Sequence, residues 1–182
     1  MNSLILPNPS RNRALFIIDI QPGFVKPENE WIIPNVERII NEGAYSFFVD
    51  AIFHADPGSI WDKEEKWTFE LSPTVPEIKK LLNPESTLFI TKTTKSAFAA
   101  GIDLVHILRD KGIEEVHIVG YDINDCVMAT ANDAFDAGFF AYVIEEGADS
   151  SENAEMKKDA LEILRENEMT NHSELITDKK II

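Results

Sequence analysis

Cysteine and long apolar runs are what this sequence most lacks. A single cysteine, Cys126, occurs among 182 residues. One cysteine cannot form a disulfide within the chain, so nothing argues for an oxidising compartment. The apolar stretch Leu4–Leu6 is too short for the core of a signal peptide, and no run approaches the length that crosses a bilayer. We therefore expect a cytoplasmic protein without membrane contacts.

Basic residues are also few. The chain has 17 Lys and Arg against 32 Asp and Glu, which gives a formal net charge of −15. A field of that sign repels nucleic acids and anionic membranes, so neither is an expected partner. A hydrophobic fraction of 44% is ordinary for a globular protein of this length. We expect residues 1–182 to form one domain that acts on a small molecule.

Hydrophobic patterning predicts strands that alternate with helices. Strands are expected at 14–20, 45–53, 87–90, 115–119 and 139–144, and helices at 35–42, 74–82, 102–111, 127–137 and 151–166. The stretch 54–72 is predicted to be irregular, and a last short strand is expected from Leu175 onward. This order is typical of an α/β protein: a three-layer, Rossmann-like fold with a mainly parallel central sheet flanked by helices. A nucleotide-binding version is excluded, because Gln21-Pro-Gly23 is not a glycine-rich loop.

Three reactive side chains lie near the carboxyl ends of predicted strands, where α/β sheets bind ligands: Asp19, Lys92 and Cys126. Cys126 is predicted where a helix begins, and the backbone N–H groups and dipole of a helix N-terminus favour a thiolate. Taken singly, each residue has a plainer interpretation, as a buried apolar thiol, a turn-capping aspartate and a solvated lysine. Together they supply a nucleophile, a base and a cation.

The motifs around these residues occur in a specific order. They are Asp19-Ile-Gln21-Pro-Gly-Phe24, Lys92-Thr-Thr-Lys-Ser96-Ala-Phe98, and the segment from Gly120 to Gly138 that contains Cys126-Val. Over roughly residues 14–145 the chain resembles the isochorismatase-like cysteine hydrolases, which include nicotinamidases and carbamoylsarcosine amidases. Lys95 is a rival for the role of the lysine, but the spacing to Ser96-Ala-Phe98 favours Lys92.

The resemblance implies how the site works. It implies a catalytic triad of Asp19, Lys92 and Cys126, and a cis peptide between Tyr121 and Asp122. The backbone N–H groups of Asp122 and Cys126 would then form the oxyanion hole. The resemblance also implies self-association, so a homo-oligomer is expected.

The sequence departs from the nicotinamidases at their metal site, which is Asp-x-His followed by two further histidines. His54 is present, but the other positions are Ile52, Ile60 and Glu70. One histidine and one glutamate are too few ligands for a protein metal site, so we expect no metal and no other cofactor. A second departure is Asn124 in place of an aspartate. Asp125, beside Cys126, would oppose thiolate formation if its charge faced the sulfur.

The wall of the substrate pocket is predicted from aromatic residues near the motifs. Phe24, Trp61 and Trp67 are the main candidates, and Gln21 and Tyr121 are also predicted to contact substrate. Core packing is an equally good interpretation for the two tryptophans.

The sequence therefore predicts a metal-free cysteine hydrolase, an amidase that cleaves a small carboxamide through a thioester. Two alternatives stay open: an ester or ureido hydrolase of the same family, and a binding or regulatory protein that keeps the fold without turnover. The isochorismatases proper commonly lack the cysteine, so the presence of Cys126 disfavours their vinyl ether chemistry.

Overall fold

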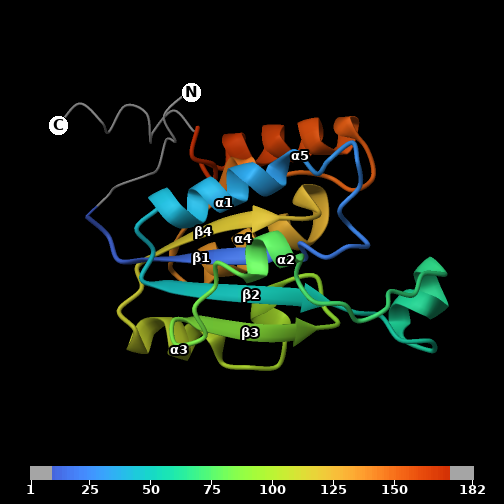
Figure 1. Cartoon of the computed structure of the whole chain (residues 1–182), viewed down its shortest axis with the longest axis horizontal. Coiled ribbons are helices and arrows are strands. Elements are labelled where there is room, and N and C mark those ends of the chain that lie inside the picture. The colour runs from blue at the N-terminus through green and yellow to red at the C-terminus, as the bar shows by residue number, and fades with distance from the viewer. Residues whose placement is uncertain (1–9, 173–182) are drawn as a thin grey trace.

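The computed structural model describes residues 10–172, which fold around a five-stranded sheet in the order β3-β2-β1-β4-β5 (Figure 1). Its strands are β1 (Arg13–Ile18), β2 (Phe47–Phe53), β3 (Thr87–Lys92), β4 (Glu115–Gly120) and β5 (Phe140–Ala148). Every neighbouring pair is parallel. The predicted α/β class with a parallel sheet is confirmed.

The central strands explain the continuous apolar runs in the sequence. β1 lies between β2 and β4, and all six of its residues are buried, as are all six of β4. A strand with neighbours on both sides and helices over both faces has no solvent side, so the apolar run of β1 is continuous. The polar residues of β4, Glu115 and His117, are also buried and pair with each other, with Nε2 2.7 Å from Oε1.

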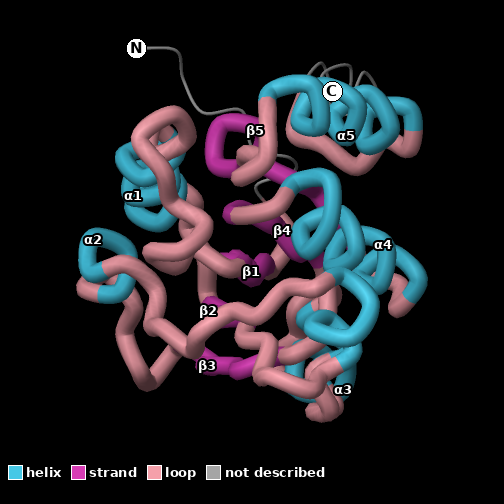
Figure 2. Tube along the Cα trace, turned by 90° about the vertical axis from the view of Figure 1, so that its right-hand side faces the viewer, coloured by secondary structure: helices cyan, strands magenta, loops and turns pink. Residues whose placement is uncertain are grey.

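Helices cover both faces of the sheet (Figure 2). A hydrophobic core lies on each face, and the first contains apolar residues of α1 (Ile32–Glu42) and α2 (Pro76–Lys79). The second contains residues of α3 (Leu104–Asp110), α4 (Met128–Asp136) and α5 (Ala154–Glu166). The protein therefore has the three layers predicted from the sequence.

Several element boundaries differ from the prediction. α1 begins three residues early and includes Pro34, which a first helical turn tolerates because its N–H would be unpaired there. α2 is only Pro76–Lys79, and α5 begins at Ala154, after the predicted start at residue 151. Its cap is Asn153, whose side chain accepts from the N–H groups of Glu155 and Met156.

The C-terminal part of the chain also differs from the prediction. β5 continues to Ala148, and Thr170 forms a single parallel bridge with Val143 beside it. The strand predicted from Leu175 lies outside the described residues. Between residues 10 and 172, none of the helices has the length and apolarity needed to span a bilayer.

Candidate active site

Asp19, Lys92 and Cys126 meet at the carboxyl edge of the sheet, and we call them the reactive cluster. β1 ends at Ile18, one residue before Asp19, and Lys92 is the last residue of β3. Cys126 lies in η3, a π-helical turn at Ile123–Val127 that follows β4 directly. Because parallel strands end at one edge, three segments distant in sequence converge there, at the arrow tips in Figure 1.

Asp19 occupies an unusual backbone conformation just past β1. Its φ is 53°, in the left-handed region, and its N–H donates to the carbonyl of Ala51 at 2.9 Å. Aspartate tolerates this conformation better than most residues. The predicted strand 14–20 therefore ends earlier, at Ile18, and Asp19 lies one residue beyond it.

Lys92 and Asp19 form a buried ion pair. Lys92 Nζ donates to Asp19 Oδ2 at 2.7 Å, and both side chains are fully buried. Nζ also donates to the carbonyl of Thr94 at 3.1 Å and lies 5.0 Å from the centre of the Phe53 ring. Two buried charges are tolerated only when they are paired and hydrogen-bonded, which is the case here.

The rival lysine lies elsewhere. Lys95 is 54% exposed, and its Nζ lies 2.6 Å from Asp125 Oδ1 at the surface. This pairing places a positive charge against the carboxylate that adjoins Cys126. The hydrogen bond to Asp125 raises the pKa of Lys95, so Lys95 remains charged at neutral pH.

Burial raises the pKa of Asp19 to about 6. The charge of Lys92 and its hydrogen bond act in the opposite direction, and the thiol of Cys126 also lowers the pKa. The second carboxylate oxygen, Oδ1, is buried and lacks a regular hydrogen bond within residues 10–172. It is the oxygen of Asp19 that is open to a proton from sulfur.

Cys126 holds its proton at rest. Burial raises the pKa of its thiol well above the ordinary value, the negative charge of Asp19 raises it further, and Lys92 opposes both. The expectation that a helix end favours the thiolate is thus wrong for the resting protein. A thiol next to a carboxylate and a buried ammonium can nevertheless pass its proton to the carboxylate when a substrate arrives.

The residues just before the turn that carries Cys126 are fixed by close packing and hydrogen bonds. Gly120 has a φ of 121°, and a Cβ there would lie 1.9 Å from the carbonyl oxygen of Ile18. The predicted cis peptide between Tyr121 and Asp122 is confirmed. The carboxylate of Asp122 accepts from the N–H and the hydroxyl of Ser151, which ties the turn to the segment after β5.

An aromatic cluster lies beside Lys92. It consists of Phe24, Phe53, Trp61, Trp67 and Phe69, whose rings contact one another with centroids 4.5–6.3 Å apart. Most come from the stretch 54–72, which extends from the end of β2 as the green arm in Figure 1. The arm contains the π-helical turn η1 (Trp61–Glu65), and the indole N–H of Trp61 donates to the carbonyl of Thr93.

Two of the five predicted substrate contacts, Gln21 and Tyr121, make buried hydrogen bonds within the protein. The Gln21 amide bonds to the N–H and carbonyl of Phe53 and to Ser72, so its hydrogen-bonding groups are used. The Tyr121 side chain is fully buried, and its hydroxyl donates to the carbonyl of Asn29 at 2.8 Å. Trp61 and Trp67 are half-buried and keep exposed surface, whereas Phe24 is almost fully covered.

The residues at the family's metal positions do not make a metal site. His54 Nδ1 lies 3.5 Å from Asp56 Oδ1, while Ile60 is 65% exposed on the arm and Ile52 and Glu70 add only one oxygen donor group. Residues 10–172 bring no three His, Cys, Asp or Glu side chains together as metal ligands. This donor set does not fit a catalytic metal ion, which is held by three protein ligands.

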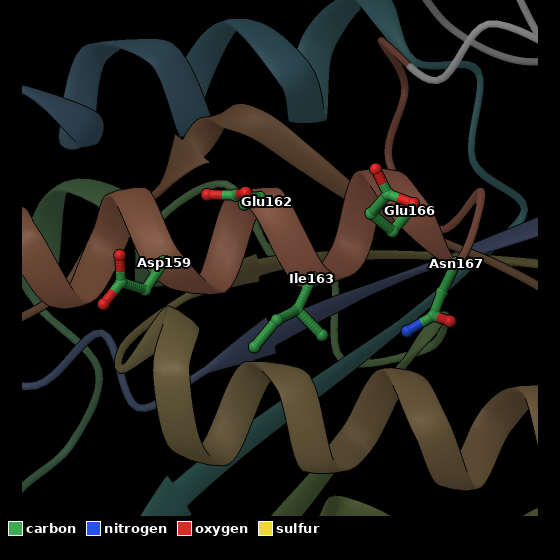
Figure 3. A pocket seen from close by; sticks show the side chains of 5 residues that line it. All are labelled: Asp159, Glu162, Ile163, Glu166 and Asn167. Carbon is green, nitrogen blue, oxygen red and sulfur yellow. The ribbon is translucent and has the colours of Figure 1, made fainter.

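A hollow elsewhere on the molecule has a different character. It has a volume of about 510 Å³ and is lined by Asp159, Glu162, Ile163, Glu166 and Asn167, all at α5 (Figure 3). None of these residues belongs to the reactive cluster, and Figure 3 shows the three carboxylates along α5. The hollow supplies no chemistry comparable to the cluster.

Sequence reasoning missed residues that support the reactive cluster. The hydroxyl of Thr130 bridges two of its segments, and Ser151 holds Asp122. A signal for Thr130 was available, because a threonine four residues after the cysteine lies on the same helical side. Ser151 carries no such signal, since its contact with Asp122 depends on where β5 ends and where η3 begins.

A parallel sheet with a buried ion pair and a thiol at its carboxyl edge is typical of α/β enzymes that bind small molecules there. Comparison with known proteins makes this specific. The model of the Isochorismatase domain matches residues 13–174, so the chain belongs to the isochorismatase family and is a hydrolase.

Individual relatives agree with this assignment. The uncharacterised isochorismatase family protein YwoC of Bacillus subtilis is 28% identical over 136 residues, which cover 69% of this chain and 71% of that one. The pyrazinamidase of Pyrococcus horikoshii, solved in complex with zinc, is similar with a TM-score of 0.68 and 26% identity over 87% of this chain and 97% of its own. The N-carbamoylsarcosine amidase of Thermoplasma acidophilum shares the fold, with a TM-score of 0.68 and 20% identity over 84% and 92% of the two chains.

Proposed function

We propose that this isochorismatase-family hydrolase is a cysteine amidase that cleaves a small carboxamide through a thioester. One observation carries the proposal. The 2.7 Å bond between Lys92 Nζ and Asp19 Oδ2 leaves Asp19 Oδ1 buried, without a regular hydrogen bond and next to the Cys126 thiol. An ionised carboxylate held in this way is a base with one proton to accept.

The reaction begins with the proton on sulfur. Asp19 Oδ1 takes that proton as Cys126 Sγ attacks the amide carbonyl carbon, and the C=O π electrons move onto oxygen. The ammonium group of Lys92 stabilises the negative charge as it passes between carboxylate and sulfur. The backbone N–H groups of Asp122 and Cys126 stabilise the oxyanion.

The intermediate then collapses. The C–N bond breaks, the nitrogen leaves as ammonia or an amine with the proton from Asp19, and a thioester to Cys126 remains. Asp19, ionised again, removes a proton from water, which attacks the thioester carbonyl. The C–S bond breaks, the acid leaves, and sulfur regains its proton.

We propose that no metal takes part in this cycle. The pyrazinamidase similar to this chain was solved with zinc, but apolar side chains stand here at two of the positions that supply ligands in nicotinamidases, Ile52 and Ile60. The charge that a Lewis acid would supply is provided at the carbonyl by backbone N–H groups and at sulfur by Lys92. Dialysis against a chelator is therefore expected to leave turnover unchanged, whereas loss of turnover that zinc restores would contradict a metal-free cycle.

The aromatic cluster supports a substrate with a flat or apolar acyl group. Trp61 and Trp67 keep exposed surface and contact Phe53, whose ring centre lies 5.0 Å from Lys92 Nζ, and an aromatic face binds such groups by contact area. Esters and ureido compounds would react by the same steps with a different leaving group, so they form the second class of candidate substrates.

The test is a panel of small carboxamides, esters and ureido compounds, with ammonia release and acid formation as readouts. We expect a carboxamide to be turned over and Cys126→Ala to lower kcat/KM by about a thousandfold or more. Mass spectrometry should also detect an acyl group on the single cysteine. A Cys126→Ala variant with full turnover would rule out the thioester.

We also propose that the enzyme works in the cytoplasm as a homo-oligomer on a freely diffusing substrate. The family resemblance supports the homo-oligomer. The single cysteine supports the cytoplasm, where disulfides are rare. Light scattering after size exclusion measures the mass in solution, and one chain's mass at micromolar concentration would contradict the oligomer.

A further inference from the structure

We infer that Thr130 is a positioning residue that holds the lysine segment, residues 92–97, against the nucleophile turn and thereby fixes Lys92 relative to Cys126. The inference rests on the proposed function and adds a fourth residue to the three of the reactive cluster. Thr130 lies on α4 and touches neither the ion pair nor the sulfur in any contact described above. Its effect is therefore exerted through other groups.

The hydroxyl of Thr130 makes two hydrogen bonds in opposite directions. It donates to the carbonyl of Cys126 at 2.7 Å and accepts from the N–H of Ala97 at 3.1 Å. The first bond alone is a common habit of threonine in helices, which bonds back to the carbonyl four residues earlier. The second bond is not local, because Ala97 lies 33 residues earlier in the chain. One hydroxyl thus joins the two segments that supply the lysine and the cysteine.

The lysine segment transmits this attachment to the ammonium group. Lys92 Nζ donates to the carbonyl of Thr94, and the hydroxyl of Thr94 donates to the carbonyl of Ser96, next to Ala97. These hydrogen bonds, joined by Thr94 and by the peptide between Ser96 and Ala97, therefore connect Lys92 to Thr130 and the carbonyl of Cys126. A shift of Ala97 would move Thr94, and with it one of the two acceptors of Lys92.

Burial makes the Thr130 link stronger than its alternative. Thr130 and Ala97 are fully buried, so no water replaces a lost bond to the Ala97 N–H. A second link joins the same segments, since Lys95 pairs with Asp125, but both side chains are partly exposed. Exposed ion pairs are screened and contribute little to holding geometry.

The decisive variant is Thr130→Val, which keeps the side-chain shape and removes the hydroxyl. Thr130→Ser restores the hydroxyl and serves as the rescue. Thr87→Val is the matched control, because the Thr87 hydroxyl also donates to a carbonyl four residues earlier, that of Asn83, at the opposite end of the sheet.

The first measurement needs no substrate. Iodoacetamide alkylates the single cysteine, and its rate is followed from pH 6 to 10.5 by mass spectrometry. Below the thiol's pKa the rate is proportional to the thiolate fraction, so we expect Thr130→Val to lower the alkylation rate about tenfold at a given pH, because the displaced ammonium stabilises the thiolate less. Thr130→Ser and Thr87→Val should keep the rate of the unmodified protein. General loosening would expose the sulfur and raise the rate, and that result would overturn the inference.

The second measurement uses a substrate from the panel. Thr130→Val should lower kcat about tenfold with KM within twofold, while Thr130→Ser stays within twofold for both. If Thr130→Val does not fold, as judged by thermal unfolding, Thr130→Ala is compared with Thr130→Ser on the same readouts. An unchanged kcat and alkylation rate in the folded hydroxyl-free variant would overturn the inference. The proposed function fails separately, if Cys126→Ala keeps turnover.

Discussion

At the Cys126 sulfur, burial and a neighbouring carboxylate outweigh the favourable end of a helix. Both raise the pKa of the thiol, and Lys92 only partly offsets them. The resting pair is therefore a neutral thiol beside an ionised Asp19 at neutral pH. Slow alkylation at mildly acidic pH would be the expected behaviour of this cysteine, and it would not indicate a protein without catalytic activity.

The pH dependence of turnover follows from Asp19. Its carboxyl must be ionised to accept the thiol proton, and burial raises its pKa to about 6. As pH falls through 6 the carboxyl becomes protonated, so kcat/KM should fall about tenfold for each further unit of pH. A pH–rate profile measures this limb, and full activity at pH 4 would exclude Asp19 as the base.

The same substitution should have a large effect at one lysine of the motif and a small effect at the other. Lys92→Met removes the buried partner of Asp19 and should lower kcat about a thousandfold or more, with a loss of about 3–5 kcal/mol in the free energy of unfolding. Lys95→Met removes an exposed partner of Asp125 and should change kcat less than tenfold. Steady-state kinetics and urea unfolding compare them, and equal losses in both variants would contradict the assignment.

At the scale of the element, the nucleophile turn depends on a close approach of two strands. Gly120 ends β4 where a side chain would meet the backbone of β1, and its φ is positive. Only glycine combines that conformation with that distance. The sequence pattern around Cys126 thus reflects packing against β1 as well as chemistry.

The Gly120→Ala variant should lose about 3 kcal/mol or more in the free energy of unfolding, because the new Cβ must displace the backbone of Ile18. Gly101→Ala is the matched control, since Gly101 also has a positive φ, 82°, but nothing lies within 4 Å of its Cβ position. Strain alone should cost that variant about 1 kcal/mol. Equal losses in urea unfolding would show that backbone conformation, and not the close approach, decides.

The arm at 54–72 is predicted to affect substrate binding more than chemistry. Trp67→Ala removes a half-buried ring that stacks on Phe53 and should raise KM about tenfold with a smaller change in kcat. Trp31→Ala is the control, because Trp31 is 41% exposed and packs against Lys157 of α5. A change in kcat alone would indicate that the arm positions Lys92 and leaves substrate binding unaffected.

At the scale of the whole molecule, the net charge of −15 acts on any charged substrate. Like charge lowers the local concentration of an anion near the protein, and salt screens this effect within about 8 Å at physiological ionic strength. For an anionic carboxamide, kcat/KM should rise a few-fold between 10 and 150 mM salt, whereas a neutral carboxamide of similar size should be unaffected. Equal salt dependence of the two substrates would contradict a field effect.

The fold class was readable because it depends on patterns along the chain. Apolar runs at β1 and β4 predict strands buried on both faces, and glycine, proline and cap residues predict where elements stop. Boundaries were less predictable, since α2 and the cap of α5 depend on what packs beside them. The internal hydrogen bonds of Gln21 and Tyr121 were not predictable, because their partners lie on distant segments.

By itself, the sequence determined the order of the elements, the parallel sheet and the three residues that meet at its edge. These follow from hydrophobic periodicity and from the rule that parallel strands end together. Only the tertiary structure decided that the Asp19–Lys92 ion pair is fully buried, where the proton of Cys126 resides and which aromatic rings stay exposed. Each of these depends on distance and burial between segments far apart in the chain, and neither quantity is encoded in any local stretch of sequence.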